Sequence, residues 1–285
     1  MAKVAVIGLG LIGGSIAAGL KKRDLGHKVM AWDKNSESLE KGLAAGLIDI
    51  KLDSPIEIDA DLVVLAMPVR ALEEILPHLD FSQAVFTDAG SVKGHVLETF
   101  KKVLGFVPKK FVPGHPIAGS EQNGVAAADP NLFLGRRVIL TPISDTDHMA
   151  IDKVAGMWGN LGSTITIMTP EHHDHVLAQT SHLPHLLAYA LVDSLSFGGD
   201  SLEVFQYAAG GFRDFSRIAA SDPVMWRDIF LTNQKPLLEI LDRYLDEVSR
   251  LRLMISEAEG DQLETILARA KVARDHFSDI TRLDD

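Results

Sequence analysis

A glycine-rich turn between a strand and a helix constrains this chain more than any other feature. The strand-like run Val4 to Ile7 leads into Gly8-Leu9-Gly10-Leu11-Ile12-Gly13, and the helix-compatible residues Gly14 to Lys22 follow directly. A strand, a glycine turn and a helix in immediate succession are typical of a βαβ unit that binds a dinucleotide. A turn of this kind on its own can also be purely structural.

Each glycine of the turn has a physical task. Gly8 permits the tight turn, Gly10 lets backbone amides approach a pyrophosphate, and Gly13 allows the helix to pack closely on the strand. The amides at the start of the helix, at Leu11 and Ile12, supply donors and positive potential to phosphate groups. We therefore predict that these five residues bind the cofactor.

An acidic residue stands where such a unit needs one. Asp33 follows the second strand-like run, 20 residues beyond Gly13. A carboxylate at this position accepts hydrogen bonds from the adenosine ribose hydroxyls, and it repels a 2'-phosphate. We predict NAD rather than NADP as the cofactor, although the neighbouring Lys34 could partly offset that repulsion.

Up to about Thr169, short apolar runs alternate with helix-like segments. The runs are Val4 to Ile7, Val29 to Trp32, Leu62 to Ala66, Ala84 to Thr87, Phe111 to Val112 and Val138 to Leu140. Short runs rich in branched residues are typical of strands buried on both faces, so we predict a Rossmann-type, doubly wound parallel sheet. Ligands of such sheets bind beyond the carboxyl ends of the strands, which adds Met67, Pro68 and Ser91 to the predicted cofactor contacts.

The strand signals disappear after Pro170, and long helical stretches follow. From Leu237 onward apolar residues recur at steps of three and four: Leu237, Leu241, Tyr244, Val248, Leu251 and Ile255, widened by Leu238, Ile240 and Leu245. One helix face cannot bury all of them in a small isolated domain, so we expect a homodimer formed through the C-terminal helices. A monomeric helical bundle is the alternative.

The 285 residues exceed one average domain, and we predict two. Residues 1–169 form the NAD-binding Rossmann domain, and residues 170–285 form an all-α domain for substrate binding and dimerisation. The net charge of −11 disfavours nucleic acid as a partner. The absence of cysteine and of a signal or membrane segment at the start makes the cytoplasm the expected location, with no membrane partner.

His115 is the strongest candidate for chemistry. It lies between Gly114 and Pro116 at a predicted strand end, where the backbone has little freedom. The near-neutral pKa of histidine suits a general base that takes a hydroxyl proton during hydride transfer. A loop histidine that caps a turn is the alternative.

Two further groups stand out in the helical half. Arg213 and Arg217 lie four residues apart, so they share a helix face and could bind carboxylates, or they could form surface salt bridges. The histidines of the second group raise the possibility of a metal site; they are His172, His173, His175, His182 and His185. No cysteine supports a metal, and Asp174 fits a polar helix start, so we predict no metal and a solvated or substrate-facing cluster.

Several motifs together resemble the prephenate and arogenate dehydrogenase family of tyrosine biosynthesis. They cover nearly the whole chain: the glycine turn from Gly8, Asp88-Ala89-Gly90-Ser91-Val92-Lys93-Gly94, His115-Pro116-Ile117-Ala118-Gly119-Ser120-Glu121, Ser181-His182-Leu183-Pro184-His185 and Gly211-Phe212-Arg213-Asp214-Phe215-Ser216-Arg217. Ordered motifs of this length are far more specific than a glycine turn.

The resemblance implies an oxidative decarboxylation, in which NAD takes a hydride from the ring carbon that bears the 4-hydroxyl and carbon dioxide leaves. By the same resemblance, His115 polarises or deprotonates that hydroxyl, and Ser91 orients it. Arg213 pairs with a substrate carboxylate, and the remaining substrate-binding residues are His182, His185, Ser120 and Glu121. A local cation is needed because the substrate is a dianion and the protein is acidic.

The substrate is prephenate or arogenate, which differ only in a keto or amino side chain. A carboxylate near that side chain, such as Glu121, is a candidate for telling them apart. The chain has no room for the mutase or regulatory domain that some members carry, so we expect the single-function form. The alternatives are a 3-hydroxy acid dehydrogenase with a lysine base, for which only Lys235 and Lys271 are available in the helical half, and a nucleotide-sensing regulator without turnover.

Overall fold

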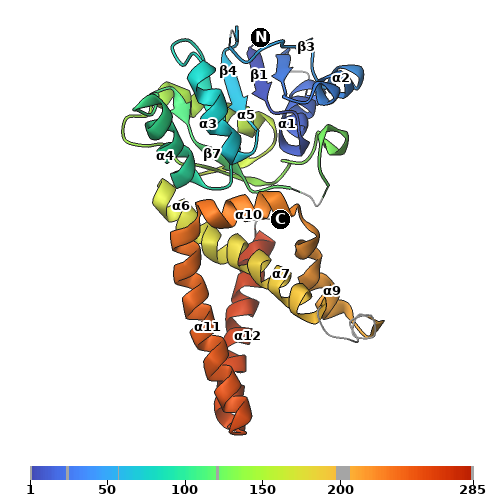
Figure 1. Cartoon of the computed structure of the whole chain (residues 1–285), viewed down its shortest axis with the longest axis vertical. Helices are drawn as coiled ribbons and strands as arrows, with labels where there is room; N and C mark the ends of the chain where they lie inside the picture. The colour runs from blue at the N-terminus through green and yellow to red at the C-terminus, as the bar shows by residue number, and fades with distance from the viewer. Residues whose placement is uncertain (1, 24–25, 57, 120–121, 197–205, 284–285) are drawn as a thin grey trace. The chain divides into compact units, whose positions relative to one another are not determined.

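The computed structural model describes residues 2–23, 26–56, 58–119, 122–196 and 206–283, with side chains as far as residue 276 (Figure 1). The chain forms two compact units, Met1–Gln234 and Lys235–Asp285. The predicted boundary between residues 169 and 170 lies inside the first unit, so the division into two functional domains stays a prediction.

A six-stranded parallel sheet is the centre of the first unit. Its strands are β1 (Lys3–Ile7), β2 (Lys28–Trp32), β3 (Ile50–Lys51), β4 (Leu62–Leu65), β5 (Val85–Asp88) and β6 (Phe111–Val112). The order β3-β2-β1-β4-β5-β6 reverses direction between β1 and β4, which creates the crevice where such sheets bind ligands. The predicted Rossmann fold is confirmed.

Helices cover both faces of this sheet because its strands are apolar on both faces (Figure 1). The helices are α1 (Leu11–Lys22), α2 (Ser36–Ala44), α3 (Leu72–Ile75), α4 (Lys93–Leu104) and α5 (His148–Asn160), with short turns η1 (Val69–Ala71), η2 (Leu76–His78) and η3 (Val125–Ala127). Val4 and Val6 pack in one core cluster with residues of α1 and α5, whereas Ala5 and Ile7 pack in another with residues of α3 and α4. The alternation follows from the two-residue period of a strand.

A smaller sheet lies next in the chain, with the order β7-β8-β9. Its strands are β7 (Gly114–Pro116), β8 (Arg137–Leu140) and β9 (Thr164–Ile167). The prediction that Val138 to Leu140 belongs to the main parallel sheet is wrong, since β8 pairs antiparallel with β7 and parallel with β9. An apolar run identifies a strand but not its partner.

The first unit ends in a group of helices. They are α6 (Pro170–Leu177), the π-helical turn η4 (Ala178–His182), α7 (Leu183–Ser196), α9 (Gly210–Ser216), η5 (Arg217–Ala220) and α10 (Pro223–Thr232). The predicted lack of strands after Pro170 holds for the described residues. Side chains cap the N-termini of α6 and α10. Thr169 accepts from the His172 amide, and Asp222 accepts from the first amides of α10.

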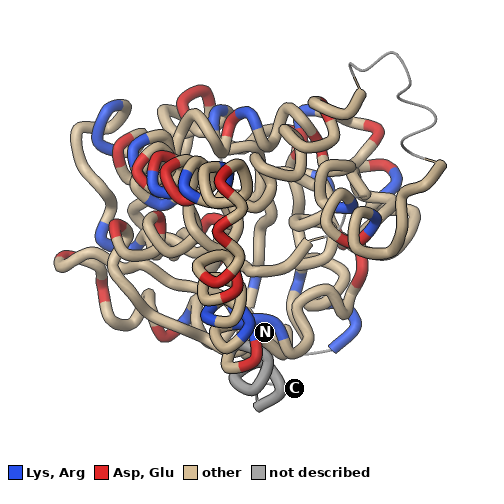
Figure 2. The backbone as a smooth tube through the Cα atoms, turned by 90° about the horizontal axis from the view of Figure 1, so that it is seen from below, with Lys and Arg blue, Asp and Glu red and all other residues tan. Residues whose placement is uncertain are grey.

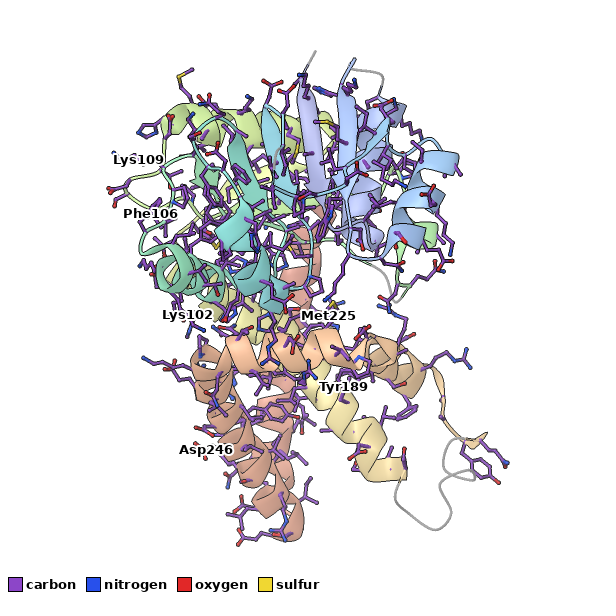
Figure 3. The ribbon with its side chains drawn as sticks, turned by 45° about the horizontal axis from the view of Figure 1, so that its top comes forward. Lys102, Phe106, Lys109, Tyr189, Met225 and Asp246 are labelled. Atoms are coloured by element: carbon purple, nitrogen blue, oxygen red, sulfur yellow. The ribbon has the colours of Figure 1, made fainter. Side chains whose placement is uncertain are left out.

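Helix α10 is joined to α7 by a hydrogen bond and lines a hollow with it. Figure 3 shows Met225 of α10 and Tyr189 of α7 on opposite sides of the α10 ribbon. The Tyr189 hydroxyl donates to the Ser221 carbonyl at 2.7 Å, which ties α7 to the start of α10. Between these helices lies a mostly apolar hollow of about 310 Å³, lined by Tyr189, Pro223, Trp226, Arg227, Phe230 and Leu231.

The second unit consists of α11, which begins at the boundary (Gln234–Ser256), and α12 (Gly260–Leu283). Much of the predicted apolar stripe on α11 is exposed within this chain, including Tyr244, Val248 and Ile255. Acidic and basic residues are interspersed along the described backbone (Figure 2). None of the described helices combines the length and the apolarity needed to cross a bilayer.

Candidate active site

The glycine turn is built by close backbone contacts. Gly8 has a φ of +98°, and a Cβ there would meet the Ala66 backbone at 2.8 Å; a Cβ on Gly13 would lie 1.9 Å from the Gly8 carbonyl oxygen. Both positions therefore require glycine for the fold itself. At Gly10 a Cβ would meet nothing within 4 Å, so this glycine leaves open space in front of α1.

That open space suits a pyrophosphate. Gly10 is the N-cap of α1, and no side chain caps the helix there or adds an acid to its first turn, which includes Leu11 and Ile12. Uncapped amides at a helix start attract anions, and a glycine without a side chain lets a phosphate reach them. The residues present fit a dinucleotide.

Asp33 lies directly beside the turn. Its carboxylate accepts hydrogen bonds from the Leu9 amide at 2.6 Å and from the Asn35 amide at 2.7 Å. These bonds hold the half-buried carboxylate at the end of β2, where its remaining lone pairs are available to ribose hydroxyls. The expected ribose-binding position is therefore consistent with the geometry.

The other predicted cofactor residues occupy neighbouring strand ends. Met67 and Pro68 follow β4, and the contact between Gly8 and the Ala66 backbone places them next to the glycine turn. Ser91 is half-buried just before α4, after β5, and among the described residues its side chain makes no hydrogen bond with His115. The predicted pairing of Ser91 with the substrate hydroxyl stays a prediction.

His115 belongs to a chain of three side chains. It lies in the middle of β7, and its Nδ1 is 2.8 Å from Nε2 of His173 on α6. Nδ1 of His173 is in turn 2.7 Å from Oδ1 of Asp174. Residues 58 apart in the sequence thus form one line of hydrogen bonds from the strand into the helix.

Asp174 is held from a third element. Its Oδ1 accepts from the Lys93 amide and its Oδ2 from the Gly94 amide, both at 2.8 Å, at the start of α4. The carboxylate is buried and acts as the missing cap of that helix. The space is tight, because a Cβ on Gly94 would lie 2.8 Å from Oδ2.

Lys93 fixes the backbone that leads to His115. Its fully buried ammonium pairs with Asp88 and donates to the Gly114 carbonyl at 2.6 Å. Asp88 also accepts from the Gly114 amide at 3.1 Å and from the Gly90 amide at 2.9 Å. This buried ion pair therefore locks the residue immediately before His115 on both of its peptide groups.

His182 and His185 lie in η4 and α7, the helical segments that follow α6. The Asn233 amide nitrogen donates to Nδ1 of His182 at 3.0 Å and to the Asp174 carbonyl at 2.8 Å. Nδ1 of His185 donates to the Ser181 carbonyl at 2.8 Å. A π-helical turn, a feature frequent at functional sites, carries His182.

Trp226 of α10 adds an aromatic wall. The His185 ring stacks on it with 3.7 Å between ring centroids, and Val92, the N-cap of α4, packs against it as well. The indole Nε1 is buried and has no hydrogen-bond partner among the described residues. The wall thus combines an apolar face with one available donor.

Burial keeps the histidines of this group neutral. It lowers the pKa of His115 well below its ordinary value, and electrostatic interactions with His173, Lys93 and His182 lower it further. Burial also lowers the pKa of His173, against the opposing effect of Asp174, and it lowers the pKa of His182 to about 4. At pH 7 an uncharged imidazole at His115 can accept a proton.

The remaining candidate residues are Arg213, Arg217, Ser120 and Glu121. Arg213 is exposed on α9, which packs against α7, and within the described residues it forms no hydrogen bond or ion pair with the His115 group. Arg217 lies near His185, whose pKa it lowers after the larger effect of burial. The two motif residues Ser120 and Glu121 lie outside the described residues.

The histidine cluster corrects one expectation. His172 and His175 are exposed as expected for a solvated group, and Asp174 lies within α6, but His173 and Asp174 are buried, so solvation is wrong for these two residues. Within the described ranges no three acidic or histidine side chains are grouped to hold a metal. Sequence reasoning also missed Lys93, because only folding places its side chain against Gly114.

Comparison with known proteins agrees with this geometry. The family described as prephenate dehydrogenase, nucleotide-binding domain, matches residues 16–167, and the prephenate dehydrogenase dimerization domain matches residues 169–269. The cyclohexadienyl dehydrogenase of Zymomonas mobilis is 39% identical, with 96% of this chain and 97% of that protein covered. The prephenate dehydrogenase of Bacillus subtilis is 37% identical over 95% of this chain and 75% of its own length.

Solved structures give the same result. The Aquifex aeolicus prephenate dehydrogenase in complex with hydroxyphenyl propionate and NAD+ superposes with a TM-score of 0.88 at 38% identity, covering 97% of this chain and 98% of that one. Synechocystis arogenate dehydrogenase superposes with a TM-score of 0.79 at 31% identity, covering 96% and 99%. The chain therefore belongs to the prephenate dehydrogenase family and is an NAD-dependent oxidoreductase.

Proposed function

We propose that this chain oxidises and decarboxylates prephenate to 4-hydroxyphenylpyruvate with NAD, as a step of tyrosine biosynthesis. The observation that carries the proposal is the line of side chains from His115 through His173 to Asp174, in which His173 contacts Nδ1 of His115 and burial lowers the pKa of His115. Relatives named for prephenate and cyclohexadienyl substrates support the substrate class.

Bound NAD supplies the hydride acceptor, and the chain supplies position and a proton acceptor. His115 takes the proton of the 4-hydroxyl as the hydride leaves the carbon that bears it. The C1–carboxylate bond then breaks, its electron pair enters the ring, and the phenolate oxygen recovers a proton. Prephenate dianion and NAD+ thus give 4-hydroxyphenylpyruvate monoanion, carbon dioxide and NADH with no net proton change, so His115 needs to hold a proton only briefly.

The other assignments are part of the same proposal. Gly8, Gly10, Gly13 and Asp33 bind NAD, with Leu11, Ile12, Met67, Pro68 and Ser91 completing the cofactor site. Arg213 binds a substrate carboxylate, helped by His182, His185, Ser120 and Glu121. The exposed apolar side chains of α11 support a homodimer formed through the C-terminal helices, and residues 1–169 and 170–285 are the two functional domains.

Formation of NADH or NADPH, followed at 340 nm, tests the proposal when prephenate and L-arogenate are each offered with NAD and with NADP. Turnover of prephenate with NAD, with 4-hydroxyphenylpyruvate as product, is expected. An absence of turnover in all four combinations, despite measurable NAD binding, would contradict it.

Arogenate is the second candidate substrate, because a structural relative with a TM-score of 0.79 is an arogenate dehydrogenase. Glu121 is proposed as a determinant of this choice, since a carboxylate favours the ammonium of arogenate. Glu121→Gln is expected to change the ratio of the two activities. An unchanged ratio removes Glu121 as a determinant.

A further inference from the structure

The hydrogen bonds around Asp174 have only one possible direction. Both carboxylate oxygens accept from backbone amides, of Lys93 and Gly94, and Oδ1 also faces Nδ1 of His173. A carboxylate that accepts on both oxygens offers no hydrogen to that ring, so Nδ1 of His173 carries the hydrogen. Nε2 of the neutral His173 ring is then a lone pair.

The same reasoning extends to His115. Its Nδ1 lies 2.8 Å from the lone pair on His173, so Nδ1 of His115 must carry a hydrogen and donate it. A neutral imidazole has one ring hydrogen, which leaves Nε2 of His115 with a lone pair. The lone pair is the feature that a base for a hydroxyl proton needs.

We propose that His173 and Asp174 are positioning residues that fix the tautomer of His115 and stabilise its protonated form. The inference rests on the proposed function and names how its base is prepared. When Nε2 of His115 takes the hydroxyl proton, the ring becomes a cation whose Nδ1 hydrogen bonds to His173. His173 in turn donates to the anionic Asp174, so two hydrogen bonds stabilise the positive charge on His115. The charge disappears when the ring gives the proton back.

Burial and backbone contacts make this line of residues rigid. His173 has no exposed surface and Asp174 is 6% exposed, so water does not compete strongly for their bonds. Lys93 links both supports of His115, because its amide donates to Asp174 while its ammonium donates to the Gly114 carbonyl. Lys93 thus helps to fix both the imidazole ring of His115, through Asp174 and His173, and the backbone next to His115, through Gly114.

A purely structural role is the competing explanation, since Asp174 also caps α4. The two explanations differ in what they require of the hydrogen on His115. Capping of α4 is indifferent to the tautomer of that ring, whereas the positioning role requires Nδ1–H. A measurement of the tautomer therefore separates them without any turnover.

The first experiment records ¹⁵N NMR spectra of the full chain labelled in histidine, with His115→Asn used for assignment. The expected result is a His115 ring protonated at Nδ1 and unprotonated at Nε2 at pH 7. A hydrogen on Nε2 in the wild-type protein would overturn the proposal. This result stands even if prephenate proves not to be the substrate.

The second experiment compares variants of His173. Gln keeps an amide oxygen where Nε2 accepts, whereas Leu removes the acceptor. His173→Leu is expected to lower kcat about 10²-fold, with KM for prephenate and Kd for NAD changed less than about threefold, and to populate Nε2–H on His115. His173→Gln is expected to stay within about tenfold of wild type and to keep Nδ1–H.

His172→Asn is the matched control, because His172 is the exposed neighbour on the same helix, and its kcat should not change. Equal kcat losses in the Leu and Gln variants, or a Leu variant that retains the wild-type tautomer, would overturn the positioning role. If His173→Leu fails to fold, the comparison of His173→Gln with wild type and the wild-type spectrum still decide.

Discussion

The cofactor turn and the His115 group are built in opposite ways. The turn is made of backbone: Gly8 and Gly13 are required by contacts below 3 Å within the first strand, turn and helix and the adjoining β4 end. The His115 group is made of side chains that come from β7, α6 and α4 and meet only after folding. The geometry of the first region follows from the spacing of its residues in the sequence, whereas the contacts of the second region do not.

The largest expected effect removes the base. His115→Asn should lower kcat about 10³-fold while leaving NAD binding nearly unchanged, because a positioned general base contributes about 10²- to 10⁴-fold. Steady-state kinetics and isothermal titration with NAD measure the two quantities. A variant with wild-type kcat would assign the chemistry elsewhere.

The cofactor region gives the next largest effect. Gly10→Ala adds a methyl group where the protein itself leaves open space, so the fold should be unaffected. Binding of NAD should weaken about 30-fold, since forcing a methyl against a bound group costs about 1–3 kcal/mol. Gly156→Ala, on α5 with equal open space, is the control and should bind NAD normally. Equal affinities in the two variants would mean that the space in front of Gly10 is not the pyrophosphate site.

The side-chain region should also be sensitive to acid. Burial lowers the pKa of His182 from 6.5 to about 4, so at pH 5 the unfolded chain binds a proton there that the folded chain does not. The stabilisation is present above pH 6.5 and is lost as the pH falls toward 4, which amounts to about 2 kcal/mol between pH 7 and pH 5. Denaturant unfolding at the two pH values measures it. His182→Asn should lose less stability over this range than His172→Asn, and an equal loss would contradict the assignment.

The choice of cofactor gives the smallest expected effect. Asp33→Asn removes the charge but keeps an acceptor for the Leu9 or the Asn35 amide. The ratio of NAD to NADP activity should fall about tenfold, because a 2'-phosphate no longer meets a carboxylate. Kinetics with each cofactor measure the ratio. If it does not change, Asp33 does not contact the ribose.

The same contrast explains what could be predicted from the sequence. The Rossmann fold and the NAD cofactor followed from Gly8, Gly13 and Asp33, because their spacing fixes their geometry. The placement of β8 was missed, since an apolar run does not specify its partner strand. The sequence singles out His115 because it follows the predicted strand Phe111 to Val112, and the structure places it in the middle of β7. Its role as the base stays a prediction.

The support of His115 could not be read from the sequence. His173 and Asp174 stand among exposed histidines at a helix start, a pattern that indicates solvation more often than burial. Their burial depends on Lys93 and Gly94 approaching from α4, 80 residues earlier in the chain. A hydrogen-bond line of this kind is a tertiary property.

The most direct test of the comparison is a two-by-two measurement of Gly10→Ala and His115→Asn, alone and combined. For all four proteins, NAD affinity is determined by titration, and kcat with prephenate is determined at saturating NAD. The double variant is expected to show the NAD affinity of Gly10→Ala and the kcat of His115→Asn, because separate regions contribute independently. A His115→Asn variant that weakens NAD as much as Gly10→Ala does would contradict the separation of the two regions.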